Sequence, residues 1–220
     1  MNIEGILHGI SIWALPVMLA IVLHEVAHGW VADKLGDDTA RWMGRLTLNP
    51  LKHIDPIGTV LVPILLLVAG SPFIFGYAKP VPVNFRKLRR PKQDMVWVAL
   101  AGPVTNVLLA IASAGLLAAV AALPGSMVWL TQPVALMCQA SILINLVLCI
   151  FNLIPLPPLD GGRVAVGLLP GRLSYQLSRL EPFGFFIIIG LLFTGVLQQI
   201  IGPPVMGSAD WLIRMAIGGV

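Results

Sequence analysis

Residues 6–32 read ILHGISIWALPVMLAIVLHEVAHGWVA, an apolar run that carries three closely spaced ionisable side chains near its end. A helix that spans a bilayer needs roughly 20 predominantly apolar residues, and this run is long enough. An ionisable side chain inside a span costs about 2.5–3.5 kcal/mol on the insertion scale, so a cluster of them needs a compensating role. This stretch therefore predicts both a membrane-embedded chain and a polar site within it.

The composition of the whole chain also indicates a membrane protein. Of its 220 residues, 57% are hydrophobic and only 11% are charged, whereas soluble proteins carry roughly 25% charged residues. Such a chain has too little polar surface for a cytosolic enzyme, a disordered tail or a coiled coil. The net charge is +4. Because aromatic residues are scarce, we expect the basic side chains to meet the headgroups of the lipid bilayer rather than nucleic acid.

Four more apolar stretches follow, over residues 57–78, 95–123, 127–152 and 183–201. The last three approach or exceed the length of a span, whereas the first is interrupted by Pro63 and by a turn signal, Gly70-Ser71-Pro72. We expect an all-α polytopic protein with a core of three transmembrane helices and peripheral helices around it. No repeat, linker or appended soluble domain is evident. Residues 1–220 are predicted to form one domain, with a core over about 6–165 and a C-terminal span and interfacial helix over about 181–220.

Lysine and arginine predict the orientation of these spans. Of the 14 Lys and Arg residues, all but Arg214 lie within residues 33–55, 77–93 and 163–180, while residues 124–133 carry no charge. By the positive-inside rule the three basic loops face the cytoplasm. The stretch between the first two loops must then enter and leave on one side, as a re-entrant hairpin. We expect a multi-pass protein of the plasma (inner) membrane with its polar site toward the cytoplasm.

The ionisable cluster at the end of the first stretch has the pattern H-E-x-x-H, in His24, Glu25 and His28. Residues four apart lie on one face of a helix, so both imidazoles can reach a single ion. Glu25 stands beside the ligands, as in sites where a carboxylate takes the proton of a zinc-bound water. The plainer interpretation, a polar cap where the helix leaves the membrane, does not explain the spacing.

A second polar segment, Asn152-Leu-Ile-Pro-Leu-Pro-Pro-Leu-Asp160-Gly-Gly, ends the stretch 127–152. Its prolines cannot continue a helix, so the backbone unwinds and Asp160 falls on a short irregular segment. Catalytic zinc prefers three protein ligands and a water molecule. Asp160 is therefore the predicted third ligand of Zn²⁺, beside His24 and His28.

Other side chains compete for the third position. His53 and Asp55 follow the second histidine by about 25 residues, a separation at which soluble zinc peptidases often place a ligand. Glu181 and His8 are weaker competitors, since a solvated loop or interface explains each of them. The longer metalloprotease motif needs glycine three residues after the second histidine. Val31 stands there, which excludes that soluble class.

Three motifs occur in order at the ends of the apolar stretches: His24-Glu25-Val-Ala-His28, Ala101-Gly102-Pro103-Val-Thr-Asn106 and Asn152-x-x-Pro155-x-Pro157-x-Leu159-Asp160-Gly161. Together they resemble the site-2 protease family of intramembrane zinc metalloproteases, in its compact form without a PDZ domain. The resemblance covers roughly residues 6–163. It implies an endopeptidase that hydrolyses peptide bonds in transmembrane segments of substrate membrane proteins.

The resemblance also implies roles for individual residues. His24, His28 and Asp160 would bind Zn²⁺, and Glu25 would act as general base and then as proton donor to the leaving amine. Asn152 would hold the metal-site loop or stabilise the oxyanion.

Three more polar or small residues are expected to be structural. Gly102 and Asn106 are predicted to pack closely and to form hydrogen bonds within the core helix. Asn145 is predicted to make an interhelical hydrogen bond.

Residues 40–48 and 80–84 are predicted as strands of a short membrane-associated β-hairpin. The prolines in the second stretch suit an edge strand, which could capture an unwound substrate by β-augmentation. The resemblance agrees with such a hairpin. Irregular loops are the alternative.

Two other classes of function compete with a peptidase. A zinc or ion transporter could use the same three ligands, but no inverted repeat and no relay of acidic or histidine residues runs through the spans. A non-catalytic zinc-binding scaffold would not need Glu25 next to a ligand. The sequence therefore favours the peptidase.

Overall fold

A computed structural model describes residues 3–68, 76 and 78–218. The described chain is helical, with irregular connections and no strand among these residues. Its helices in chain order are α1 (Ile3–Lys34), α2 (Thr39–Trp42), α3 (Val62–Val68), α4 (Pro91–Ala121), α5 (Val128–Asn152), α6 (Asp160–Leu168), α7 (Gly171–Ser178), α8 (Glu181–Phe193) and α9 (Val196–Ala216). Short 3-10 turns cover Pro50–Lys52, Phe85–Lys87 and Gly125–Met127, and a π-helical turn covers Pro56–Leu61.

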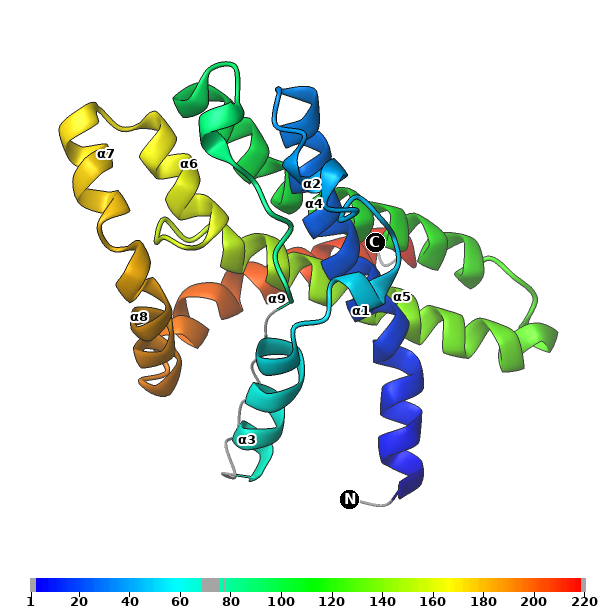
Figure 1. Ribbon diagram of the computed structural model, residues 1–220. Helices are drawn as coiled ribbons and strands as arrows, with labels where there is room; N and C mark the ends of the chain where they lie inside the picture. The colour runs from blue at the N-terminus through cyan, green and yellow to red at the C-terminus, as the bar shows by residue number, and fades with distance from the viewer. Residues whose placement is uncertain (1–2, 69–75, 77, 219–220) are drawn as a thin grey trace.

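Three helical segments are long and apolar enough to cross a membrane: Leu7–Lys34, Pro91–Ala121 and Gly125–Asn152. These are the three predicted core spans, so the expectation of an all-α membrane protein built on three transmembrane helices is confirmed. Helix α4 packs against both α1 and α5, and α1 also contacts α5 (Figure 1). The middle span is therefore the one around which the other two are arranged.

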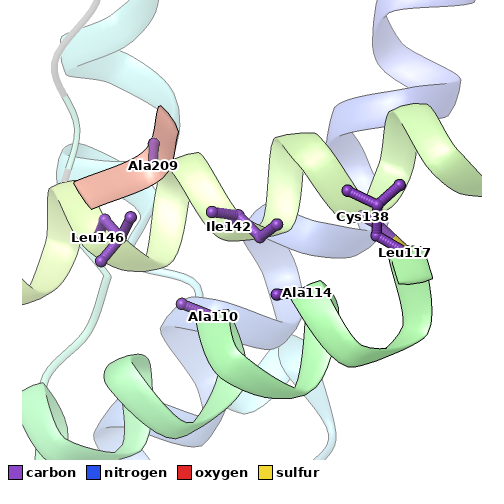
Figure 2. Close-up of a cluster of buried hydrophobic side chains, with 7 residues drawn as sticks. All are labelled: Ala110, Ala114, Leu117, Cys138, Ile142, Leu146 and Ala209. Carbon is purple, nitrogen blue, oxygen red and sulfur yellow. The ribbon is translucent and has the colours of Figure 1, made fainter. Parts of the chain in front are cut away.

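Small and apolar side chains close the α4–α5 interface toward the C-terminal end of α4 (Figure 2). Small residues such as alanine let helix backbones approach closely, which favours van der Waals contact in a bilayer where lipid competes for apolar surface. Helix α9 adds one residue to this cluster and runs alongside α5. The buried members are Ala110, Ala114, Leu117, Cys138, Ile142, Leu146 and Ala209.

The two predicted strands are wrong. The stretch 40–48 begins inside the short helix α2, and the stretch 80–84 is extended but pairs with no strand among the described residues. Its two prolines have no N–H to give to a ladder. The N–H groups of Val81 and Asn84 are bound by side-chain carboxylates of α1 and of the loop after it. The extended backbone is thus held by side chains rather than by a neighbouring strand.

Residues 56–68 extend away from the body of the protein (Figure 1). This part of the chain consists of the π-helical turn at Pro56–Leu61 followed by α3. The predicted turn at residues 70–72 lies outside the described residues. Beyond it, the N–H of Lys79 donates to the carbonyl oxygen of His53 at 2.9 Å. The residues on either side of the segment 54–78, His53 and Lys79, are therefore in direct contact, as a hairpin requires.

Two helices cover the C-terminal region, for which a span and an interfacial helix were expected. Helix α8 ends at Phe193 and α9 begins at Val196. Gly195 between them has a φ of +75°, a left-handed conformation that glycine adopts without strain. Helices α7 and α8, bent by 63° at their junction, form a candidate fourth span if they are counted together.

Candidate metal centre

His24 and His28 lie one turn apart on α1, and Asp160 lies in the first turn of α6. The Nε2 atoms of the two imidazoles are 3.0 Å apart. Oδ2 of Asp160 is 3.2 Å from each of them. In a tetrahedral zinc site the ligand atoms are about 2.1 Å from the metal and so about 3.4 Å from one another. The spacing of these three atoms fits a single metal ion.

The outer nitrogen of each imidazole faces a hydrogen-bond acceptor. Nδ1 of His28 is 2.7 Å from the carbonyl oxygen of Val98, and Nδ1 of His24 is 2.5 Å from Oδ1 of Asn106. The orientation of the Asn106 amide follows from its Nδ2, which donates to the carbonyl oxygen of Ala20 at 3.3 Å. Both imidazoles therefore carry their proton on Nδ1 and present a lone pair at Nε2, as metal ligands do.

A chain of hydrogen bonds extends from His24 across α4 to α5. Nδ2 of Asn106 also donates to Oδ1 of Asn145 at 2.7 Å, and Nδ2 of Asn145 donates to the carbonyl oxygen of Ser141 at 2.8 Å. The hydroxyl of Ser113 donates to that of Ser141 at 2.7 Å. The predicted interhelical hydrogen bond of Asn145 is confirmed. This chain fixes the imidazole of His24 through both neighbouring spans.

Gly102 is the point at which α4 approaches the two imidazoles. A Cβ atom added there would lie 2.4 Å from Nε2 of His28 and 2.5 Å from Cε1 of His24. No side chain fits without moving the ligands. The predicted close packing at Gly102 is confirmed, and the partners are the metal ligands themselves.

The loop before α6 is packed tightly enough to fix Asp160. Added Cβ atoms would meet the backbone of this loop at 2.2 Å from both Gly161 and Gly162, and at 1.8 Å from Gly184 of α8. Oδ2 of Asp160 is buried and receives no directed hydrogen bond from the described residues. The donor set is thus two neutral imidazoles and one carboxylate, which suits zinc.

A cavity of about 140 Å³ opens onto these three side chains, and both Glu25 and Asn152 line it. Oε2 of Glu25 accepts a hydrogen bond from the N–H of Val81 at 2.7 Å. Nδ2 of Asn152 donates to the carbonyl oxygen of Leu148, one turn back on its own helix, at 2.9 Å. A second, mainly apolar cavity of about 460 Å³ shares Glu25 and Asn152 and extends between α1, α5 and α8.

The competing third ligands lie elsewhere. Nε2 of His53 faces a backbone carbonyl, and Asp55 caps the π-helical turn that follows it. Glu181 is 3.5 Å from Arg163, and His8 lies near the start of α1. Within residues 3–68, 76 and 78–218, one group of three potential ligands could hold a metal ion, and it is the group of two histidines and one aspartate described above.

Comparison with known proteins agrees with this chemistry. The sequence model of peptidase family M50 matches residues 120–194, which include Asp160, and no PDZ domain is matched. A protein of Bacillus subtilis (strain 168) named "Putative zinc metalloprotease YwhC" is 38% identical over 206 residues, which are 91% of this chain and 89% of that protein. The chain belongs to peptidase family M50.

Further relatives of this M50 peptidase are named "Putative zinc metalloprotease Rip2". The protein from Mycolicibacterium smegmatis is 29% identical over 83% of this chain. The protein from Mycobacterium tuberculosis (strain H37Rv) is 30% identical over 82% of this chain, and 66% of each relative is covered. No solved structure matches. The resemblance to site-2 proteases is confirmed, and the M50 peptidase is a membrane zinc metalloprotease.

The motifs do not show how the M50 peptidase supports its ligands. The acceptor for His28 is the backbone carbonyl of Val98, which carries no sequence signal. The donor to Glu25 is likewise a backbone N–H, that of Val81. Asn106 is different, because a buried amide within an apolar span is a signal in itself.

Proposed function

We propose that the M50 peptidase hydrolyses peptide bonds within transmembrane segments of other membrane proteins, with His24, His28 and Asp160 as zinc ligands and Glu25 as general base. The observation that carries the proposal is the convergence of three ligand atoms beside Glu25 at the end of a spanning helix. All four side chains line one cavity, which supports their joint action on one bound peptide.

Each side chain has a defined part in the reaction. Bound zinc would acidify a water molecule and polarise the carbonyl of the scissile bond. Glu25 would take a proton from this water and later deliver it to the leaving nitrogen. Asn152 lines the same cavity and would donate to the developing oxyanion. Because its Nδ2 binds the carbonyl of Leu148, this role requires the Asn152 side chain to rotate when substrate arrives.

The shape of the site supports an apolar, unwound substrate. Helical backbone binds its own carbonyls, so a transmembrane segment must unwind before hydrolysis. The larger cavity next to Glu25 is lined mainly by apolar side chains of three helices, among them Ile21, Phe151 and Ile188. Such a cavity suits the aliphatic and aromatic side chains of an unwound transmembrane segment.

The orientation of the protein forms part of the same proposal. The basic loops mark the cytoplasmic face of the plasma (inner) membrane, and the zinc site lies near that face. The hydrogen bond between Lys79 and His53 supports an arrangement with the two flanking basic loops on one side. Residues 57–78 accordingly form a re-entrant hairpin rather than a further span.

The proposal is tested by comparing the wild type with Glu25→Gln on a model transmembrane substrate in proteoliposomes. We expect the substitution to lower the cleavage rate by about 10²–10⁴-fold while zinc stays bound. Glu4→Gln, at the exposed start of the same helix, is the matched control and should cleave normally. Cleavage by Glu25→Gln at the wild-type rate would exclude this mechanism.

A second variant tests the third ligand. Asp160→Asn keeps the shape of the side chain but removes its charge, so both zinc content and cleavage should fall. Full zinc content in this variant, measured by mass spectrometry of the purified protein, would assign the third ligand to another residue.

A further inference from the structure

Arg45 is a buried cation that the hydrolytic chemistry does not use. It is 7% exposed, and its Nη2 donates to the carbonyl oxygens of Lys79 at 2.8 Å and Pro80 at 3.3 Å. No carboxylate pairs with it among the described residues. A guanidinium is costly to bury unless its N–H groups find partners. These two bonds therefore bind Arg45 and the backbone at Lys79-Pro80 to each other.

The backbone of Lys79 is held from a second direction as well. Its N–H donates to the carbonyl oxygen of His53 at 2.9 Å. The ring of His53 is buried, and its Nε2 lies 2.9 Å from the carbonyl oxygen of Thr47. Both polar groups of the Lys79 main chain are thus engaged by the segment that precedes α3. This arrangement fixes the point from which the chain runs toward the metal centre.

Val81 joins this fixed backbone to Glu25. Its N–H donates to Oε2 of Glu25 at 2.7 Å. Its side chain packs on α1, where a Cβ added to Gly29 would lie 2.6 Å from Cγ1 of Val81. Pro80 and Pro82 on either side have no N–H. Val81 is therefore the one residue of this tripeptide that can donate to the carboxylate from its backbone.

We propose that Arg45 is a positioning residue for Glu25 and acts through the N–H of Val81. Arg45 fixes Lys79-Pro80, the N–H of Val81 then fixes Oε2 of Glu25, and the second carboxylate oxygen is left for proton transfer. The inference rests on the proposed role of Glu25 as base. It matters for rate because a misplacement of about 1 Å at a reacting group can cost about 100-fold.

The N–H itself is tested by a matched pair of substitutions. Val81→Pro removes the donor, whereas Val81→Ala keeps the donor and removes most of the side chain. We expect Val81→Pro to lower kcat by about 10- to 100-fold, with KM for the model transmembrane substrate and the zinc content unchanged. Val81→Ala removes packing on α1 but keeps the hydrogen bond that positions the base, so its kcat should fall clearly less than that of Val81→Pro. Equal kcat values for the two variants would overturn the proposal.

The role of Arg45 is tested by Arg45→Met, with Arg45→Lys as the variant that retains one charged donor. We expect Arg45→Met to show the same fall in kcat at unchanged KM, and Arg45→Lys to recover part of it. Arg172→Met, at an exposed arginine of α7, is the control. The double variant Arg45→Met/Val81→Pro should lose no more than Val81→Pro alone, because both changes break one path to Glu25.

Several results would contradict this role. Losses that multiply in the double variant, a raised KM with intact kcat, or wild-type kcat in Arg45→Met would each overturn it. Should Arg45→Met fail to fold, the Val81 pair decides the question alone. An inactive Glu25→Gln beside fully active Arg45→Met and Val81→Pro would reject this inference and leave the proposed function standing. Cleavage by Glu25→Gln at the wild-type rate would reject the proposed function itself.

Discussion

Helices α4 and α5 are joined in two different ways along one interface. Toward the C-terminal end of α4, Ala110 and Ala114 pack with Ile142 in an apolar cluster (Figure 2). One turn away, the amide of Asn106 binds that of Asn145 at 2.7 Å. An apolar contact tolerates small shifts of the helices, whereas a hydrogen bond fixes both partners. The apolar half should therefore govern stability, and the polar half should govern the geometry of the metal site.

The largest effect expected in the polar half comes from Gly102→Ala. The added Cβ would collide with both imidazoles, so we expect zinc affinity to fall by more than about 100-fold and cleavage to fall with it. Gly115→Ala on the same helix meets nothing within 4 Å and should bind zinc normally. Chelator competition on the purified proteins measures the zinc affinity of both variants. Equal zinc affinities in the two variants would show that α4 does not constrain the imidazoles.

The apolar half is tested by Ile142→Ala. Truncation of a buried isoleucine leaves a cavity, so we expect the free energy of unfolding to fall by about 2–5 kcal/mol. Ile111→Ala is the control, because Ile111 is 52% exposed on α4. Unfolding in detergent micelles gives the stability, and chelator competition gives the zinc affinity. A large loss of zinc affinity in folded Ile142→Ala would remove the distinction between the two halves.

A smaller effect is expected from Asn106→Ala. The substitution removes the acceptor that fixes Nδ1 of His24, and loss of such a supporting partner typically costs about 10- to 100-fold in metal affinity. Asn106→Asp keeps an acceptor oxygen at that place and should retain most of the affinity. Both substitutions disturb the contact between residue 106 and Asn145, but only Asn106→Ala removes the acceptor for His24. A difference in zinc affinity between the two variants therefore reports the orientation of the imidazole.

The smallest effect is expected from Ser113→Ala, at the outer end of the hydrogen-bond chain. The change removes one hydrogen bond to Ser141. Interhelical hydrogen bonds of this kind average about 0.6 kcal/mol in membranes. Zinc affinity should stay at the wild-type value when measured as for Asn106→Ala. A loss as large as that of Asn106→Ala would extend the polar half to this end of the interface.

The features that could be predicted from the sequence are those set by short-range spacing. His24 and His28 are one helical turn apart, and Asp160 directly follows a run of prolines that ends a span. The three core spans follow from the length of their apolar runs. In each of these cases the residues that decide the structure lie within one continuous stretch.

The features that could not be predicted join distant parts of the chain or depend on backbone atoms. Nothing in the motif around Gly102 indicates that its missing side chain makes room for His28. The predicted strand at residues 80–84 failed because its amide donors are taken by carboxylates far away in sequence. The break at Gly195 lies within an apolar run in which glycine is also common inside spans.

The hydrogen bond between Lys79 and His53 joins the two ends of the segment 54–78, which is called the ring here, and these two residues form its base. Because Arg45 anchors that base, a change in the length of the ring need not reach the zinc ligands. Loop-closure entropy grows slowly with length, so added residues cost little. A change in the length of the ring should therefore leave zinc affinity unchanged, whereas it should alter the substrate cavity, to which Gly76 and Ala78 contribute.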